Sequence, residues 1–370
     1  MITKGILIIV AVFLGLLILI PLALNMSGSS FGPGFLDTRL SYGQKILISY
    51  DGGISWRKTA ENISSEISDI AFDPRNPNIV FLGSKNKGLW QSTNRGQDWQ
   101  KIEDESGALD SKSRINKIII ARSDPKIIFL AAYQSRRGII LKSADGGKNF
   151  KEIYRLNPAG KEIFDIYANI ENRDNLLAST EEGDLLETIN GGETWKVKDK
   201  FNKAIVGFET GIRKLSFFYA FTSDNDIYKI YNEGQTVAVN TNGLKYNNNL
   251  RRTSGVSLSL EGESLREFTV DKNNPQTIYA VKSSGLTRSL DGGTTWKTLD
   301  TLISGNSQSL DTVAVSPANS NIIFTSSGSQ LYKSVDGGTT WKIISVPSAR
   351  NLVKIYINPL SPETIIALAR

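Results

Sequence analysis

The residues of this chain with the clearest chemical potential are aspartates that recur in Asp-Gly-Gly triplets. Asp51, Asp145, Asp291 and Asp336 each follow a Ser by two positions and precede an aromatic residue by five. Carboxylates serve as general acids, as nucleophiles and as calcium ligands. A calcium loop needs oxygen ligands at alternating positions, and the glycines after each Asp supply no side-chain oxygen. We therefore interpret these aspartates as turn-forming residues, neither catalytic nor metal-binding.

The composition excludes several other classes of chemistry. The 370 residues include no Cys and no His. Disulfides, zinc sites with these ligands, Cys nucleophiles and His-dependent acid–base catalysis are therefore excluded, and we expect no cofactor and no metal. With 40% hydrophobic residues the chain is predicted to be globular. A net charge of +6 is compatible with an anionic partner without requiring one.

The N-terminal segment is predicted to cross a membrane. Residues 5–24 carry no charge, and twenty helical residues span roughly 30 Å, the thickness of a bilayer's hydrocarbon core. Signal peptides usually have a shorter apolar run and a small-residue cleavage site. We therefore expect residues 1–24 to be a transmembrane signal-anchor helix and residues 25–40, rich in Ser and Gly, to be a flexible tether.

The charges that flank this segment predict its orientation. Lys4 precedes the apolar run, and no Lys or Arg follows it until Arg39. The positive-inside rule then places the N-terminus in the cytoplasm and the rest of the chain outside it, in a periplasm, in a lumen or at the cell surface. Whether the helix is ever cleaved stays open.

The aspartates belong to an eight-residue motif that recurs along the chain. Its Asp or Asn and its closing aromatic residue are Asp51 and Trp56, Asn94 and Trp99, Asp145 and Phe150, Asn190 and Trp195, Asp291 and Trp296, and Asp336 and Trp341. A seventh, degenerate copy keeps only Asn232 and Gly234. In such a turn we expect the Asp or Asn to accept backbone N–H bonds two residues on, Gly to supply positive φ, and the aromatic ring to pack against a neighbouring blade.

The spacing of the motif predicts a propeller. The copies lie 42 to 59 residues apart, which is the period of a four-stranded blade. Upstream of most copies lies a strand, a Pro/Asn turn and a second strand, so each blade reads A, B, C, D with the motif between C and D. Residues 44–58 supply only strands C and D, and residues 351–369 only A and B. The sequence therefore predicts an all-β, single seven-bladed β-propeller over residues 41–370, closed by its two ends.

The repeated Ser-x-Asp-x-Gly-x-Thr-Trp pattern resembles the Asp-box (BNR-repeat) β-propeller superfamily. It is closest in pattern to photosystem II assembly/stability factor-like and sortilin-like propellers. Sialidases and two-propeller xyloglucanases belong to the same superfamily. The resemblance implies the fold, whereas function depends on sites outside the repeat. The Arg-Ile-Pro tripeptide usual in sialidases is absent, and the chain has residues for only one propeller, so a non-enzymatic role is favoured.

Candidate binding residues lie in the B–C and D–A loops, which share the face opposite the motifs. Two B–C turns are basic and two are acidic, which favours protein over nucleic-acid recognition. The sequence thus predicts a membrane-anchored scaffold, assembly factor or accessory subunit of a membrane protein complex. A cell-surface glycan-binding protein or a sialidase-like glycoside hydrolase is the alternative. The predicted partner-binding residues are Lys85, Lys87, Arg136, Arg137, Arg251 and Arg252, and the acidic turns contain Glu181, Glu182, Asp224 and Asp226.

Overall fold

The computed structural model describes residues 44–157, 159–169, 172–211, 217–224, 226–231, 236–239, 265–301 and 309–370. These residues form 28 β-strands in four-stranded antiparallel sheets. The predicted signal anchor (1–24), the tether (25–40), the degenerate motif at Asn232 and Gly234, and Arg251 and Arg252 lie outside the described residues. Within the described ranges, no helix is long and apolar enough to cross a membrane.

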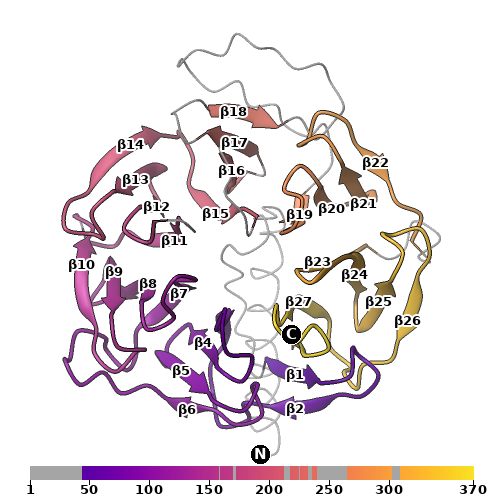
Figure 1. The fold of residues 1–370 in the computed structure, drawn as a ribbon, viewed down its shortest axis with the longest axis horizontal. Helices are drawn as coiled ribbons and strands as arrows, with labels where there is room; N and C mark the ends of the chain where they lie inside the picture. Colours follow the sequence, from indigo (N-terminus) through magenta and orange to yellow (C-terminus); the bar gives the residue numbers. More distant parts are fainter. Residues whose placement is uncertain are drawn as a thin grey trace, which may run out of the picture. The chain divides into compact units, whose positions relative to one another are not determined.

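The sheets are the blades of a seven-bladed propeller (Figure 1). Blade 1 contains β3 (Ile67–Phe72), β4 (Val80–Ser84), β5 (Leu89–Ser92) and β6 (Gln100–Lys101). Blade 2 contains β7 (Arg114–Ile120), β8 (Ile128–Gln134), β9 (Arg137–Ser143) and β10 (Lys151–Arg155). Blade 3 contains β11 (Ile163–Ala168), β12 (Leu176–Thr180), β13 (Asp184–Thr188) and β14 (Lys196–Lys200).

The remaining blades repeat this order. Blade 4 contains β15 (Ile205–Glu209), β16 (Phe217–Thr222), β17 (Ile227–Tyr231) and β18 (Thr236–Val239). Blade 5 contains β19 (Leu265–Val270), β20 (Ile278–Lys282), β21 (Gly285–Ser289) and β22 (Lys297–Thr298). Blade 6 contains β23 (Thr312–Ser316), β24 (Asn319–Ser327), β25 (Gln330–Ser334) and β26 (Lys342–Ile344). Blade 7 contains β27 (Leu352–Ile357), β28 (Ile365–Ala369), β1 (Lys45–Ser49) and β2 (Arg57–Thr59).

Burial differs between the strands of a blade because the sheets pack face against face. The second strand is covered on both sides, so β4, β12, β20 and β28 are buried along their whole length. Such strands read as continuous apolar or small residues instead of alternating ones. The fourth strand forms the rim and is often short, with two residues in β6 and two in β22. Short outer strands leave little unpaired edge.

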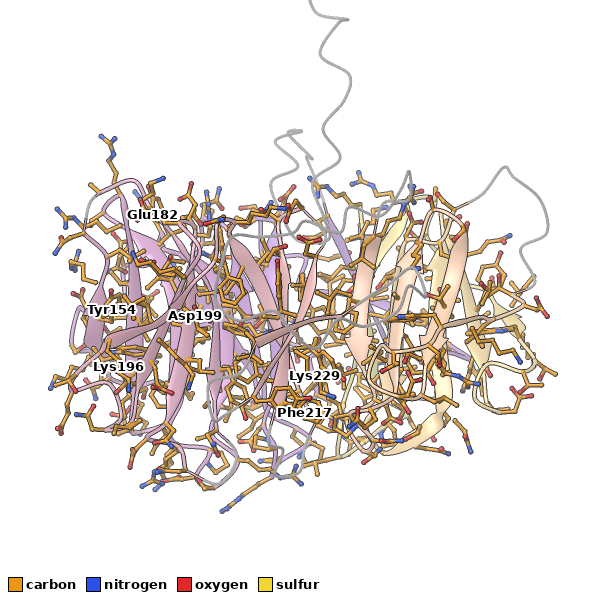
Figure 2. The ribbon with its side chains drawn as sticks, turned by 90° about the horizontal axis from the view of Figure 1, so that it is seen from above. Tyr154, Glu182, Lys196, Asp199, Phe217 and Lys229 are labelled. Atoms are coloured by element: carbon orange, nitrogen blue, oxygen red, sulfur yellow. The ribbon has the colours of Figure 1, made fainter. Side chains whose placement is uncertain are left out.

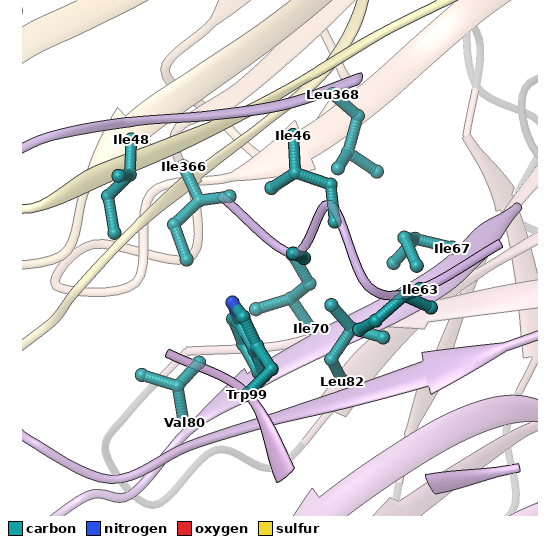
Figure 3. Packing of buried hydrophobic residues seen from close by; sticks show 11 residues of the cluster. Ile46, Ile48, Ile63, Ile67, Ile70, Val80, Leu82, Trp99, Ile366 and Leu368 are labelled. Atoms are coloured by element: carbon teal, nitrogen blue, oxygen red, sulfur yellow. The ribbon is translucent and has the colours of Figure 1, made fainter. Parts of the chain in front are cut away.

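Blade 7 joins residues from the two ends of the described chain. Its sheet order is β2-β1-β28-β27, and β1 pairs antiparallel with β28 from Lys45↔Ala369 to Ser49↔Ile365. An apolar cluster fills the seam between blades 7 and 1, with Trp99 packed against side chains from both blades (Figure 3). Its other members include Ile46, Ile48, Ile63, Ile67, Ile70, Val80, Leu82, Ile366 and Leu368.

The innermost strands share a β-bulge near their first residues. The pairing register shifts there in six of the blades, which turns the next side chain along each strand. The shifts lie between Ile67 and Asp69, Ile115 and Lys117, Ile163 and Asp165, Ile205 and Gly207, Leu265 and Glu267, and Leu352 and Lys354.

Candidate partner-binding face and the axial charges

The motif turns are closed by bonds within each motif, as blade 6 illustrates. The Ser334 hydroxyl donates to Asp336 Oδ1 at 2.8 Å and accepts the Gly338 N–H at 2.8 Å. Asp336 Oδ1 accepts the Thr340 N–H at 2.9 Å, and the Thr340 hydroxyl donates to Oδ2 at 2.6 Å. The Asp336 carboxylate therefore accepts the backbone N–H of the residue four positions on. The expectation that it accepts the N–H two positions on was wrong. Gly337 and Gly338 have positive φ of 73° and 88°, as the sequence predicted.

These bonds stabilise the ionised carboxylates. Hydrogen bonds from Ser55 lower the pKa of Asp51 to about 2, and those from Asn149 and Thr340 lower the pKa of Asp145 and Asp336 to about 2. A general acid would need a pKa near the working pH. The aspartates are thus structural. Within the described ranges, no three acidic side chains converge in a way that would hold a metal ion.

The closing aromatic residues pack against the preceding blade. Trp99 of blade 1 contacts the blade 7 cluster and donates its indole N–H to the Thr59 hydroxyl at 3.1 Å. Trp195 of blade 3 donates to the Ile153 carbonyl of blade 2 at 3.1 Å. Phe150 lies among blade 1 side chains, and Trp341 among those of blade 5. Each motif thus fixes its own turn and the seam beside it.

The loop face, formed by the B–C and D–A connections, carries the four predicted basic residues that the structure describes, Lys85, Lys87, Arg136 and Arg137. Lys85 forms an ion pair with Glu66, and the Arg137 guanidinium donates to Asn157 Oδ1 and to the Leu156 carbonyl. These two cations are therefore engaged by their own surroundings.

Two cations of the loop face are exposed instead. Lys87 and Arg136 stand at the tips of the B–C turns of blades 1 and 2, and neither has an ion-pair partner among the described residues. Their backbones are held in place, because the Lys87 carbonyl accepts the Trp90 indole N–H at 3.0 Å and the Arg136 carbonyl accepts the Gly160 N–H at 2.6 Å. The pair thus presents free charge from fixed turns.

The acidic turns of blades 3 and 4 are compensated. Lys161 lies 3.9 Å from Glu181 and 3.8 Å from Glu182, measured from Nζ to a carboxylate oxygen. Lys203 forms ion pairs with Asp224 and with Asp226. Glu182 marks this face in Figure 2, with Lys229 and Phe217 nearer the opposite one. The predicted acidic sector is therefore largely neutralised, whereas Lys87 and Arg136 stay available.

A group of charged residues around the propeller axis was missed in the sequence. Asp69, Lys117, Asp165, Glu267 and Lys354 each follow the bulge of an innermost strand. The three carboxyl residues are 8%, 4% and 6% exposed. An ion pair joins Lys354 of blade 7 to Glu267 of blade 5, so the charge pair reaches past blade 6. We call these five residues the axial charges.

The axial charges link neighbouring blades. Lys117 Nζ lies 3.9 Å from Asp165 Oδ1 on the next blade. Asp69 accepts the Ile118 N–H at 2.9 Å, and Asp165 accepts the Phe208 N–H at 2.8 Å, in each case from the following innermost strand. The carboxylates thus satisfy backbone groups that would otherwise be unpaired between sheets.

Burial dominates the ionisation of the three axial carboxyl groups. It raises the pKa of Asp165 to about 6, against the opposing charge of Lys117, and it raises the pKa of Asp69 and Glu267. The carboxylate of Asp165, followed by that of Asp69, raises the pKa of Lys117. A sequence signal did exist, because each charged residue follows a buried Ile or Leu of the innermost strand by two positions.

The closed ring, the four-stranded sheets and the Ser/Thr–Asp/Asn bonds of the C–D turns together define an Asp-box β-propeller. The model of the family described as photosynthesis system II assembly factor YCF48 matches residues 49–358. The chain belongs to this family.

Solved structures share the fold at low sequence identity. YCF48 bound to D1 peptide has a TM-score of 0.60 at 17% identity, covering 92% of this chain and 100% of that one. YCF48 from Cyanidioschyzon merolae has a TM-score of 0.59 at 16% identity, covering 82% and 96%. The GH74 xyloglucanase from Xanthomonas campestris has a TM-score of 0.64 at 14% identity, covering 89% of this chain and 52% of that one. The chain thus spans about half of the xyloglucanase.

A curated relative matches a shorter stretch. Vacuolar protein sorting/targeting protein 10 of Debaryomyces hansenii is 30% identical over 87 residues, which is 24% of this chain and 5% of that protein. The similarity covers only a small part of either chain.

Proposed function

We propose that this chain is a membrane-anchored, extracytoplasmic propeller that binds another protein and acts as an assembly factor or accessory subunit of a membrane complex. The observation that carries the proposal is the pair Lys87 and Arg136, exposed cations without ion-pair partners on fixed turns of the loop face. Family membership and the D1 peptide bound to YCF48 support a protein partner. The surface suits an acidic segment of that partner.

The first described strand begins at the loop face. Strand β1 is the third strand of blade 7, and a third strand begins on the face of the B–C turns. With residues 1–24 as the anchor and 25–40 as the tether, the partner would itself be a membrane protein or a subunit of a membrane complex.

Charge reversal tests the docking face. Lys87→Glu with Arg136→Glu in the full chain should reduce recovery of co-purifying membrane proteins about tenfold or more in detergent pull-downs read by mass spectrometry. The matched control is Lys126→Glu with Lys148→Glu, which reverses two exposed cations on the opposite face. Equal losses in both variants would contradict a specific face, and unchanged recovery in the first would refute the site.

Membrane fractionation tests the anchor. The full chain should stay with the membrane pellet after alkaline carbonate washing, whereas a chain lacking residues 1–40 should be released. Release of the full chain would refute the anchor while leaving the docking face testable by pull-down.

A carbohydrate-active propeller is the second candidate. The observation behind it is the buried axial carboxyl of Asp165, with a pKa of about 6, which is in the range of a general acid. Hydrolysis of a fluorogenic sialoside or of xyloglucan that is lost in Asp165→Asn, with folding intact, would establish this function. We expect no turnover by the parent chain.

A further inference from the structure

The B–C turn of blade 2 has an unfavourable backbone conformation. Gln134 pairs with Arg137 across the hairpin, and the two residues between them, Ser135 and Arg136, have positive φ of 50° and 61°. A side chain at such a φ crowds the following carbonyl oxygen, so residues other than Gly, Asn and Asp rarely adopt it. Among the described residues, four that are not Gly have positive φ, and two of these four are adjacent in this turn. The turn is therefore strained at both of its central positions.

The fold does not require Ser and Arg at these two positions. A two-residue turn with positive φ at both central positions is formed without strain by Asn-Gly. In blades 1, 3, 5 and 6, a glycine takes the positive φ at the B–C turn. These glycines are Gly88 (68°), Gly183 (85°), Gly285 (127°) and Gly328 (58°). Blade 2 therefore carries its Ser and Arg at some cost in stability.

Hydrogen bonds to the preceding loop hold the strained turn in place. Gln134 Oε1 accepts the Ser113 hydroxyl at 2.6 Å and the Asp110 N–H at 3.1 Å, and Gln134 Nε2 donates to the Ala108 carbonyl at 2.8 Å. All of these partners belong to the D–A connection between blades 1 and 2. The Gln134 side chain thus fixes one side of the turn.

Hydrogen bonds to the following loop fix the other side. The Arg136 carbonyl accepts the Gly160 N–H at 2.6 Å, and the Gly138 N–H donates to the Lys161 carbonyl at 2.7 Å. Gly160 and Lys161 belong to the D–A connection between blades 2 and 3. A strained backbone persists where the surrounding structure over-determines it, and such positions are concentrated at ligand-binding sites.

The two arginines of this turn differ in what their side chains contact. The Arg137 guanidinium donates to Asn157 Oδ1 and, at 3.4 Å, to the Leu156 carbonyl. The Arg136 side chain is exposed and has no ion-pair or hydrogen-bond partner among the described residues. Asp110 of the anchoring loop does not pair with it, and Asp110 Oδ1 accepts the Lys112 N–H at 2.7 Å. The strained turn thus presents a free guanidinium.

We propose that Arg136 determines the specificity of the loop face: its guanidinium binds a side-chain carboxylate of the partner's acidic segment through two parallel N–H···O bonds. The inference rests on the proposed function, because it names the group that this face recognises. A planar guanidinium offers a carboxylate two donors in a fixed geometry, whereas a lysine ammonium acts as a point charge. A glycine at position 136 would relieve the strain and remove the guanidinium, so stability and binding are opposed at this residue.

Peptide binding to the full-length chain in detergent tests the recognised group. The probe is a fluorescent peptide of alternating Glu and Ser with an amidated C-terminus, and its control has Gln in place of Glu. The Glu probe should bind and the Gln probe should not. Arg136→Lys keeps the charge but loses the two-donor geometry, and it should weaken binding of the Glu probe about fivefold. The same change at the engaged neighbour, Arg137→Lys, should leave the affinity within about twofold of the parent.

Thermal unfolding of the same chains tests the link between strain and recognition. Ser135→Asn with Arg136→Gly should raise the unfolding midpoint by about 1–3 °C and weaken binding of the Glu probe about tenfold. Ser135→Asn alone relieves strain beside the guanidinium, so it should raise the midpoint and leave binding unchanged.

Five results would overturn the proposal. They are equal binding of the two probes, parental affinity in Arg136→Lys, parental affinity in Ser135→Asn with Arg136→Gly, a lowered midpoint in that double variant, and full displacement of the Glu probe by inorganic phosphate at constant ionic strength. The last of these would assign the guanidinium to a phosphate group.

The detergent pull-down separates this inference from the proposed function. Lost capture of membrane proteins by Lys87→Glu with Arg136→Glu, together with parental capture by Arg136→Lys, would refute the inference alone. Unchanged capture by the charge-reversed variant would refute both.

Discussion

The two ends of each blade are held by different kinds of bond. On the Asp-box face, a turn such as Ser334–Thr340 is closed by contacts among residues at most four positions apart. Towards the loop face and the axis, the bonds run between blades, as with Lys354 and Glu267 or Lys117 and Asp165. One end of the blade is thus determined locally and the other by the closure of the ring.

The two kinds of bond differ in how much they can vary from blade to blade. The turn of each Asp box is closed by bonds within the box, so these turns repeat almost unchanged. Bonds between blades depend on which blades meet, so the axial charges differ from one blade to the next.

The largest effect is expected at the axis. Lys354→Ala leaves the carboxylate of Glu267, 6% exposed, without its partner. Removing one member of a fully buried pair typically costs about 3–5 kcal/mol in the free energy of unfolding. Because the Lys354 side chain is 41% exposed, we expect a loss of about 3 kcal/mol, at the low end of that range. Urea unfolding measures this loss, and the double variant Lys354→Met with Glu267→Gln should recover much of it. A loss below about 1 kcal/mol would show that water compensates the Glu267 carboxylate once Lys354 is removed.

A smaller effect is expected within one Asp box. Ser334→Ala removes a buried hydroxyl that bonds both Asp336 and the Gly338 N–H. An unpaired buried donor costs about 1–3 kcal/mol. Thermal unfolding measures the change, with Thr339→Ala as the control because the exposed Thr339 hydroxyl makes a peripheral bond at 3.1 Å. Equal losses in the two variants would contradict a special role for the box Ser.

The two ends should respond to pH with opposite signs. Hydrogen bonds from Thr340 lower the pKa of Asp336 from 3.8 to about 2, so its stabilising contribution is present above pH 3.8 and lost as pH falls towards 2. Burial raises the pKa of Asp165 from 3.8 to about 6, so folded protein holds that proton more tightly and stability falls as pH rises from 3.8 to 6.

Unfolding curves at several pH values test these signs. The stability advantage of the parent over Asp336→Asn should grow with rising pH below 4, and its advantage over Asp165→Asn should shrink between about pH 4 and 6. Slopes of the same sign for both variants would contradict the assignment.

The smallest effect on stability is expected at the loop tips. Lys87→Glu with Arg136→Glu changes exposed charges without ion-pair partners, so the free energy of unfolding should move by no more than about 0.5 kcal/mol. Chemical denaturation of the variant used in the pull-down provides this measurement. A larger loss would mean that weaker capture reflects misfolding, and it would remove the support for a docking site.

The sequence predicted the locally determined end well. The Asp-box spacing, the positive φ of the box glycines and the seven blades follow from residues that lie close together in the chain. The sequence also predicted a basic sector on the loop face, but it could not show that Lys85 is paired with Glu66 while Lys87 is exposed. That distinction depends on the conformation of the folded loops.

The axial charges could not be located by the same reasoning. Asp69 and Lys117 are 48 positions apart, and each looks like an ordinary polar residue in a strand of alternating polar and apolar residues. Asp69 is buried and Lys117 is half-buried, and in each strand a β-bulge turns the side chain that follows it. A prediction that assumes simple alternation leaves out the register shift, and it therefore assigns these side chains to the wrong face of the strand.

The pairing of β1 with β28 means that blade 7 can be completed only after β28 has been synthesised. Strand β1 is among the first described strands to leave the ribosome, and its partner β28 is the last. Until then β1 has an open edge and the apolar seam around Trp99 lacks Ile366 and Leu368. Such an edge is a site for mispairing with other chains. A chaperone that covers β1 during translation would therefore matter most for this blade, while the blades encoded by one continuous segment can complete their sheets as they emerge.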